Sequence, residues 1–203
     1  MTRTRLARRA LGRFGLYSTF AFSMAFAPTA HAEFDPGWYI GGGAGLYTFT
    51  EVTSTVPSQL RGESAVGQQI FGGYQLKFIA LEAGYWYFNK LSGTSGGIED
   101  RFQMDGWFGR GMLMLPFEYS PSTSIAIFGG GGAQNWKVDT ESRDKTAGTI
   151  ISKNSFSQDG TSIIGGIWIR GQHASTRLEY EVFSIKDSDD EIGIWTINFV
   201  YNF

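Results

Sequence analysis

Ionised side chains stand at every second position of otherwise apolar segments. In the segment 175–184, Arg177, Glu179 and Glu181 share one face of an extended chain, and apolar side chains occupy the other. Carboxylates beside guanidinium groups act either as general acids and bases or as structural ion pairs. The expected members of one network are Glu82, Arg110, Arg177, Glu179 and Glu181. We interpret this network as structural, because an unpaired buried charge costs several kcal/mol and each charge here has a possible partner.

A possible nucleophile and general base also occur together, in the sequence GQHAS. His173 stands two residues before Ser175, and a histidine can activate a serine hydroxyl. Two residues so close within a turn seldom reach nucleophile–base geometry, and no hydrolase motif surrounds them. We therefore predict an exposed turn histidine and a protein that is not an enzyme.

Metal and nucleotide sites have little support in the sequence. The chain has no cysteine and two histidines, so a zinc site is not expected. The acidic run 187–191 could bind calcium or bridge lipopolysaccharide through divalent cations. Its spacing matches no EF-hand loop, and we favour a solvated loop. The glycine-rich runs 41–45 and 129–132 complete neither a dinucleotide-binding nor a P-loop motif. We predict no cofactor.

The segments that carry the charges have the two-residue period of β-strands. Most have the length of about ten residues that a tilted membrane-spanning strand needs. The eight predicted strands are 37–49, 66–76, 78–89, 104–115, 124–137, 161–170, 175–185 and 192–203. Polar loops are predicted at 50–65, 90–103, 138–160 and 186–191, and short turns near 75–77, 116–123 and 171–174. This sorting of loops is typical of an outer-membrane barrel.

The charged faces are predicted to line the inside of the barrel. An eight-stranded barrel has just enough interior space for side chains, and glycines between Tyr39 and Tyr47 leave room for long Arg and Glu side chains. In the fourth strand Arg110 is placed inside, with Trp107 toward lipid, because an arginine at the lipid midplane costs about 2–4 kcal/mol. A half-exposed strand of a soluble protein shows the same alternation. A membrane barrel and a soluble barrel are therefore distinguished by whether the charged faces point inward or outward.

The first 32 residues have the organisation of a secretory signal peptide. Five arginines and no acid precede the apolar stretch FGLYSTFAFSMAFA, and Ala30-His31-Ala32 fits a cleavage site. We predict general secretion, a barrel domain at 33–203, and placement in the outer membrane of a Gram-negative type cell. Removing five arginines takes the formal net charge from −2 to −7, which argues against nucleic acid as a partner. No later segment has the apolar length of a transmembrane helix.

The last nine residues, WTINFVYNF, form an alternating strand that ends on an aromatic residue. Termini fray unless they are held, so this strand is expected to pair with the first one. Closure of the barrel satisfies every backbone group inside lipid. Aromatic girdles are expected at both membrane interfaces. The predicted girdle residues are Trp38 at one interface and Trp136 and Trp195 at the other.

Several stretches of the chain resemble a known family. WYIGGGAG, IFGGYQ, ALEAGYWYF, RLEYEVF and INFVYNF are similar to segments of small OmpA-like and OmpX-like barrels, and equally to the opacity-protein and outer membrane protein β-barrel domain group. The likeness spans residues 33–203 and is one of pattern more than of motif. It implies that the barrel-assembly machinery recognises Phe199, Tyr201 and Phe203 as an assembly signal.

These observations predict an all-β, eight-stranded, antiparallel up-and-down transmembrane barrel with a side-chain-filled interior. We expect contact with outer-membrane lipid and lipopolysaccharide. Surface loops would serve membrane integrity, adhesion, or interaction with host or surface ligands. The alternatives are a barrel enzyme that modifies lipid A, a narrow channel, and a soluble lipocalin-like binder, which would have an apolar interior.

Overall fold

The described part of the chain consists of β-strands joined by turns. The computed structural model describes residues 36–51, 64–120, 123–171, 173–185 and 191–203. Its strands are β1 (Gly37–Glu51), β2 (Ser64–Gln75), β3 (Ile79–Phe88), β4 (Leu91–Ser95), β5 (Ile98–Ser120), β6 (Thr123–Asp144), β7 (Ile150–Arg170), β8 (Ala174–Ile185) and β9 (Glu191–Asn202). Within these ranges no helix is long and apolar enough to span a membrane. The predicted signal peptide, residues 1–32, lies outside the described residues.

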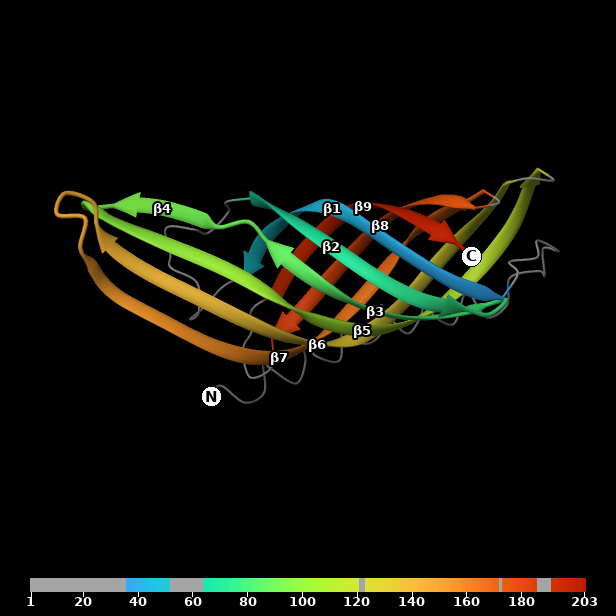
Figure 1. Ribbon diagram of the computed structural model, residues 1–203, viewed down its shortest axis with the longest axis horizontal. Helices are drawn as coiled ribbons and strands as arrows, with labels where there is room; N and C mark the ends of the chain where they lie inside the picture. Colours follow the sequence, from blue (N-terminus) through green and yellow to red (C-terminus); the bar gives the residue numbers. More distant parts are fainter. Residues whose placement is uncertain (1–35, 52–63, 121–122, 172, 186–190) are drawn as a thin grey trace, which may run out of the picture. The chain divides into compact units, whose positions relative to one another are not determined.

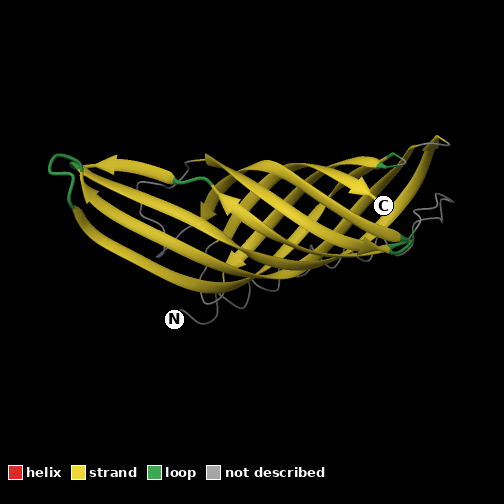
Figure 2. Cartoon of the chain, in the orientation of Figure 1, coloured by secondary structure: helices red, strands yellow, loops and turns green. Residues whose placement is uncertain are grey.

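Eight of these strands form a closed antiparallel barrel (Figure 1, Figure 2). Hydrogen bonding follows the order β3-β2-β1-β9-β8-β7-β6-β5, and a further pairing of β3 with β5 closes the ring. The short strand β4 pairs with the start of β5, beyond the end of β3. The predicted eight-stranded barrel is confirmed, and the C-terminal strand is held by its pairing with β1.

The register of the strands fixes the tilt and width of the barrel. A path from Trp38 across successive paired residues around the ring returns to β1 at Thr48, ten residues further along the strand. Such an advance over eight strands corresponds to a tilt of about 40° and a backbone radius of about 8 Å. Each full path therefore climbs about 25 Å along the barrel axis, close to the height of a membrane's apolar band.

The two faces of each strand differ as the sequence predicts. Trp107 and Leu81 lie on the outside and are 67% and 64% exposed, whereas Glu82, Arg110 and Arg177 lie inside and are at most 5% exposed. This arrangement confirms the phase predicted for the strand that carries Arg110. The outer face is therefore apolar, and the ionised residues lie in the lumen together with buried aromatic and aliphatic side chains. An apolar outer face is the opposite of what a soluble lipocalin-like binder would show.

Two of the predicted loops are strands. The range 90–103 contains β4 and the start of β5, and the range 138–160 contains the end of β6 and the start of β7. The turn between β4 and β5 is Gly96-Gly97, and both residues have positive φ (58° and 83°), as a two-residue hairpin turn requires. Strands β5, β6 and β7 thus run far past the barrel (Figure 1). Residues 52–63 and 186–190, in the other two predicted loops, lie outside the described residues.

Candidate functional site

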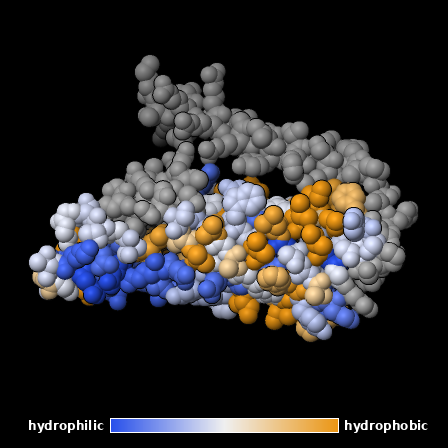
Figure 3. Space-filling model, turned by 90° about the horizontal axis from the view of Figure 1, so that it is seen from above, coloured by the Kyte–Doolittle hydropathy of each residue, from blue (hydrophilic) through white to orange (hydrophobic). Residues whose placement is uncertain are grey.

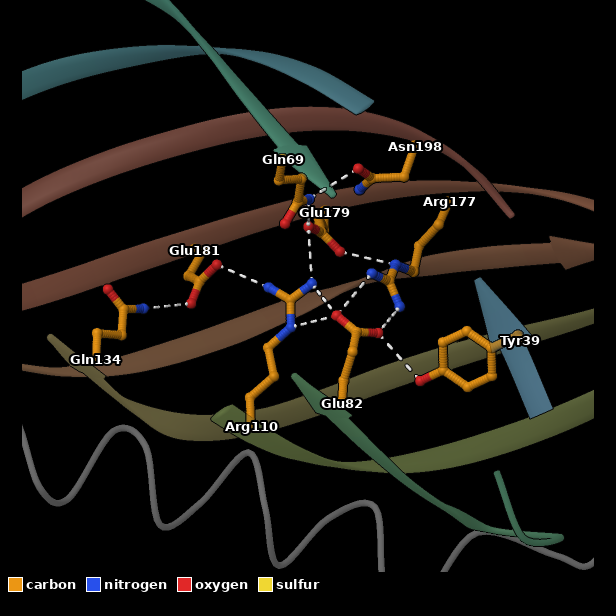
Figure 4. A network of polar contacts seen from close by, with 9 residues as sticks. All are labelled: Tyr39, Gln69, Glu82, Arg110, Gln134, Arg177, Glu179, Glu181 and Asn198. Atoms are coloured by element: carbon orange, nitrogen blue, oxygen red, sulfur yellow. Dashed lines mark hydrogen bonds and ion pairs between the residues drawn. The ribbon is translucent and has the colours of Figure 1, made fainter. Parts of the chain in front are cut away.

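Nine polar side chains meet inside the barrel (Figure 4). They are Tyr39, Gln69, Glu82, Arg110, Gln134, Arg177, Glu179, Glu181 and Asn198. Every ring strand except β7 contributes at least one of them. All five charged residues predicted from the sequence belong to the cluster. The five charged residues lie on average about 10 Å above Trp38 along the barrel axis, near the middle of the apolar band.

Arg110 contacts all three carboxylates. Its Nε donates to Glu82 Oε1 at 2.7 Å, Nη1 to Glu181 Oε2 at 2.8 Å, and Nη2 to Glu179 Oε1 at 3.3 Å. Gly132 lies directly opposite on β6, and a Cβ at that position would stand 2.7 Å from the Arg110 Cβ. The absence of a side chain on the facing strand therefore gives this arginine its room.

Arg177 and Glu82 form the second centre of the network. Arg177 Nη1 donates to Glu82 Oε2 at 2.7 Å and Nη2 to Glu82 Oε1 at 3.2 Å, the bidentate geometry of strong arginine–carboxylate pairs. Arg177 Nε lies 2.8 Å from Glu179 Oε2. The guanidinium carbon also lies 4.5 Å from the centroid of the Phe71 ring, a cation–π contact.

Two glutamines that sequence reasoning missed extend the network. Gln69 Nε2 donates to Glu179 Oε1 at 2.6 Å and to Asn198 Oδ1 at 2.7 Å. Gln134 Nε2 donates to Glu181 Oε1 at 2.9 Å. Both glutamines are 5% exposed. Their inward positions follow from the two-residue period of β2 and β6, which was the signal that could have found them.

The network suits a structural plug better than a catalytic centre. Three carboxylates contact two guanidinium groups, and all five side chains are fully buried. The Tyr39 hydroxyl donates to Glu82 Oε2 at 3.0 Å, so Glu82 is surrounded by donors. A carboxylate that accepts hydrogen bonds from guanidinium groups is a poor general base, because its charged form is already stabilised.

An aromatic cluster fills the lumen between the charge network and the end of the barrel from which β5–β7 extend. The Trp86 and Phe88 rings stack with centroids 5.3 Å apart, and Trp136 contacts Phe183 at 5.2 Å. The prediction that Trp136 belongs to the membrane girdle is wrong, since this residue is 2% exposed. Trp136 shares the inward side of β6 with Gln134, two residues away.

Outside the barrel, aromatic and aliphatic side chains form an apolar belt. Trp38 and Trp195 are 66% and 58% exposed, and the register places Trp195 about 17 Å above Trp38 along the axis. In Figure 3, apolar residues gather over the barrel, and hydrophilic residues gather at the end that carries β4. This belt has the dimensions of a lipid-facing surface with an aromatic residue near each border.

The sheet that extends beyond the belt carries alternating charges on its outer face. Arg101 Nη2 lies 3.0 Å from Glu99 Oε2 and Arg101 Nη1 lies 3.4 Å from Glu141 Oε1, while Arg143 Nη2 lies 3.2 Å from the same Glu141 oxygen. The hydrogen bond from Arg101 lowers the pKa of the Glu99 carboxyl. Charged pairs of this kind on an outward face indicate contact with water rather than lipid.

Comparison with known families matches residues 17–203 to the outer membrane protein β-barrel domain. The chain belongs to this family. Its closed barrel, apolar belt and charged lumen are those of an integral outer-membrane protein. A comparison with curated protein sequences found no match.

Solved structures share the fold of this outer-membrane barrel. The attachment invasion locus protein Ail of Yersinia pestis, in complex with the heparin analogue sucrose octasulfate, is 13% identical, with a TM-score of 0.55 over 83% of this chain and 99% of Ail. Neisserial surface protein A is 12% identical, with a TM-score of 0.51 over 83% of this chain and 99% of that chain. The N-terminal β-barrel domain of Pseudomonas aeruginosa OprF is 11% identical, with a TM-score of 0.50 over 82% and 98%. At these identities the likeness concerns the fold alone.

The structure separates the two residues that could have formed a nucleophile–base pair. His173 is exposed, and its ring lies 6.3 Å from the Tyr201 ring centroid. Ser175 points into the lumen, where its Oγ accepts a hydrogen bond from Asn202 Nδ2 at 2.6 Å. Among the described residues, no three acidic or histidine side chains gather in a way that could hold a metal ion.

The C-terminal aromatic residues all lie on the outer surface of the outer-membrane barrel. Phe199, Tyr201 and Phe203 are 70%, 52% and 74% exposed. The Phe203 amide donates to the Trp38 carbonyl at 3.0 Å, so the last residue is tied to the first strand. Recognition of these three residues by the assembly machinery stays a prediction from the family resemblance.

Proposed function

We propose that this outer-membrane barrel is a non-enzymatic protein that presents an extended surface sheet to molecules outside the cell, for adhesion or surface contact. The observation that carries this proposal is the length of β5, β6 and β7. Nine residues of β5 separate Trp107, at the border of the apolar belt, from Ile98 at the tip, which is about 30 Å of extended chain. Membrane crossing alone does not need this extra length.

The filled lumen supports this role over a channel. Ion pairs occupy the middle of the barrel, and the aromatic cluster of Trp86, Phe88, Trp136 and Phe183 fills the space toward the extended end. A conducting path would have to displace both layers. We therefore propose that the barrel is a rigid anchor that contributes to membrane integrity, and that the extended sheet makes the specific contacts.

Two further partners follow from the position of the protein. Outer-membrane lipid, including lipopolysaccharide, is proposed to surround the apolar belt. The barrel-assembly machinery is proposed to recognise the terminal strand, whose Phe199, Tyr201 and Phe203 side chains are all exposed. Export by general secretion after cleavage at residue 32 belongs to the same proposal.

Removal of the β6–β7 extension tests the surface role. Residues 140–154 can be replaced by Asn-Gly, because Asp139 and Ser155 are paired in the register and a two-residue turn can join them. Cells that display the full chain are expected to bind a heparin-coated surface, a probe suggested by the heparin analogue bound to Ail. The shortened variant should lose this binding.

Heat-modifiable migration on a gel must show that the shortened barrel still folds. Equal binding by the two forms would exclude the β6–β7 extension as the contact surface. Absence of binding by cells with the full chain would refute adhesion to this class of polysaccharide. Full-length protein in a soluble periplasmic extract would contradict the outer-membrane anchor itself.

A further inference from the structure

A row of outward side chains crosses four strands at the border of the apolar belt. Tyr85, Trp107, Asn135 and Asp159 are successive register partners on β3, β5, β6 and β7. With strands about 4.8 Å apart, this row is about 14 Å long. Trp107 is 67% exposed, and Asn135 and Asp159 are exposed as well. The row therefore combines a large open aromatic face with polar groups.

Side-chain contacts hold this row in place. The Tyr85 ring meets Trp107 edge-on, with centroids 4.8 Å apart, and the Tyr85 hydroxyl donates to Asp105 Oδ2. Asn135 Nδ2 donates to Asp159 Oδ1 at 2.8 Å. Each carboxylate can accept several hydrogen bonds, so one such contact does not exhaust the acceptor capacity of either aspartate. The surface is thus ordered before any partner arrives.

The position of the row brings it against lipid head groups. Trp107 lies about 19 Å above Trp38 along the barrel axis, and Asp105 and Asp159 lie about 5 Å higher. This level coincides with the upper border of an apolar band about 25 Å tall. A molecule that fills the space beside Trp107 therefore has acyl chains below it and a head group level with the two aspartates.

The opposite side of the barrel has a similar aromatic pair without the polar groups. Trp195 contacts Tyr180 at a centroid distance of 4.7 Å, and its register partner on β1 is Leu46. A general aromatic girdle explains Trp195 and Tyr180. It does not explain why Asn135 and Asp159 continue the row of Trp107 on the β5–β7 side.

We propose that the row binds the sugar head group of an outer-leaflet glycolipid. One face of a pyranose ring carries C–H groups that complement the negative face of the Trp107 indole, and its hydroxyl groups can donate to Asp105 and Asp159. A head group with phosphate alone would meet the two aspartates as like charges, beside one lysine, Lys137, which is the register partner of Asp105 and already pairs with Asp139. This inference rests on the proposed contact with outer-leaflet lipid and assigns that contact to one face of the barrel.

Unfolding of the full chain in lipid vesicles tests the proposal. Phosphatidylcholine vesicles containing lipopolysaccharide are compared with vesicles containing phosphatidylglycerol at the same lipid charge. A ligand that binds only the folded protein divides the unfolding constant by 1 + L/Kd, where L is the free ligand concentration and Kd its dissociation constant. Lipopolysaccharide is expected to lower it about tenfold for the wild type and for the control Trp195→Ala, but less than about twofold for Trp107→Ala and Asp105→Asn.

Three outcomes would overturn the proposal. If Trp107→Ala and Trp195→Ala lose the same amount of stabilisation by lipopolysaccharide, the effect is that of a general aromatic girdle. If phosphatidylglycerol stabilises the protein as much as lipopolysaccharide does, the effect depends on lipid charge and needs no sugar. Equal stabilisation by the free lipopolysaccharide core oligosaccharide would remove the lipid anchor from the explanation. Asn135→Ala, at an exposed position, provides a second variant if Trp107→Ala fails to fold. Heparin binding by the extended sheet is a separate readout, so either proposal can fail alone.

Discussion

Replacement of Arg177 by methionine tests whether the lumen network depends on charge balance. Arg177 is fully buried and makes a bidentate contact with Glu82 at 2.7 and 3.2 Å and an ion pair with Glu179 at 2.8 Å. Methionine is flexible and apolar, but it ends about where Nε of Arg177 lies and so lacks the guanidinium group. The change therefore removes the charge, its hydrogen bonds and the cation–π contact with Phe71, and keeps an apolar side chain in the lumen.

The expected loss is large because two carboxylates lose a partner inside a low-dielectric lumen. Removing one member of a buried ion pair costs about 3–5 kcal/mol. The matched control is Arg101→Met, since Arg101 also contacts two glutamates, at 3.0 and 3.4 Å, but its side chain is 25% exposed. Ion pairs on an outward face that water reaches contribute little to stability, so Arg177→Met should be clearly the more destabilising of the two identical substitutions.

Urea-induced unfolding in phospholipid vesicles, followed by tryptophan fluorescence, measures both variants. A second substitution, Glu82→Gln, removes one carboxylate and restores the original excess of one negative charge. The double variant Arg177→Met/Glu82→Gln should therefore be more stable than the sum of the two single effects allows, by about 1–3 kcal/mol. Strict additivity, or a loss below about 1 kcal/mol in Arg177→Met, would refute the argument that charge pairing decides how this lumen is filled.

Three further predictions concern the strand geometry, the terminus and the surface sheet. Gly43→Ala should cost about 3 kcal/mol of stability or more, or prevent folding, because the new Cβ would clash with β9. A Cβ at Gly109 meets nothing within 4 Å, so Gly109→Ala should be neutral. Equal effects of the two substitutions on the urea midpoint would contradict this geometry. Deletion of Phe203 should reduce the amount of assembled barrel in cell membranes, while the stability of the refolded protein should change by no more than about 1 kcal/mol. Normal assembly of this variant would refute the prediction that Phe203 belongs to the assembly signal. The hydrogen bond from Arg101 lowers the pKa of the Glu99 carboxyl. The contribution of this carboxylate to stability is therefore present above the unfolded pKa of about 4.3 and is lost as pH falls through the folded pKa. NMR titration should show a higher Glu99 pKa in Arg101→Met, and an unchanged Glu99 pKa would exclude the hydrogen bond as the cause.

Within the membrane, alternation predicted both the strands and their orientation. Lipid on one side and a crowded lumen on the other impose opposite requirements on successive residues, so Arg177 and Leu178 already indicate which face is which. The same reasoning placed Arg110 inside and Trp107 outside. Beyond the membrane this constraint disappears, because water contacts the outer face of the sheet and polar residues are accepted on both sides. Sequence reasoning therefore predicts loops at 90–103 and 138–160, where cross-strand pairing in fact continues the strands.

The misplaced Trp136 shows what alternation cannot supply. A single strand does not reveal whether its bulky residues have space inside, since the lumen is shared among eight strands. Trp136 fits there because its register partner on β5 is Gly106, whose added Cβ would lie 2.9 Å from the indole. Recognising this pair requires the register of β5 against β6, which the hairpin that joins the two strands fixes. The glycine that makes room for Trp136 therefore stands on another strand, and the alternation within one strand does not reveal it.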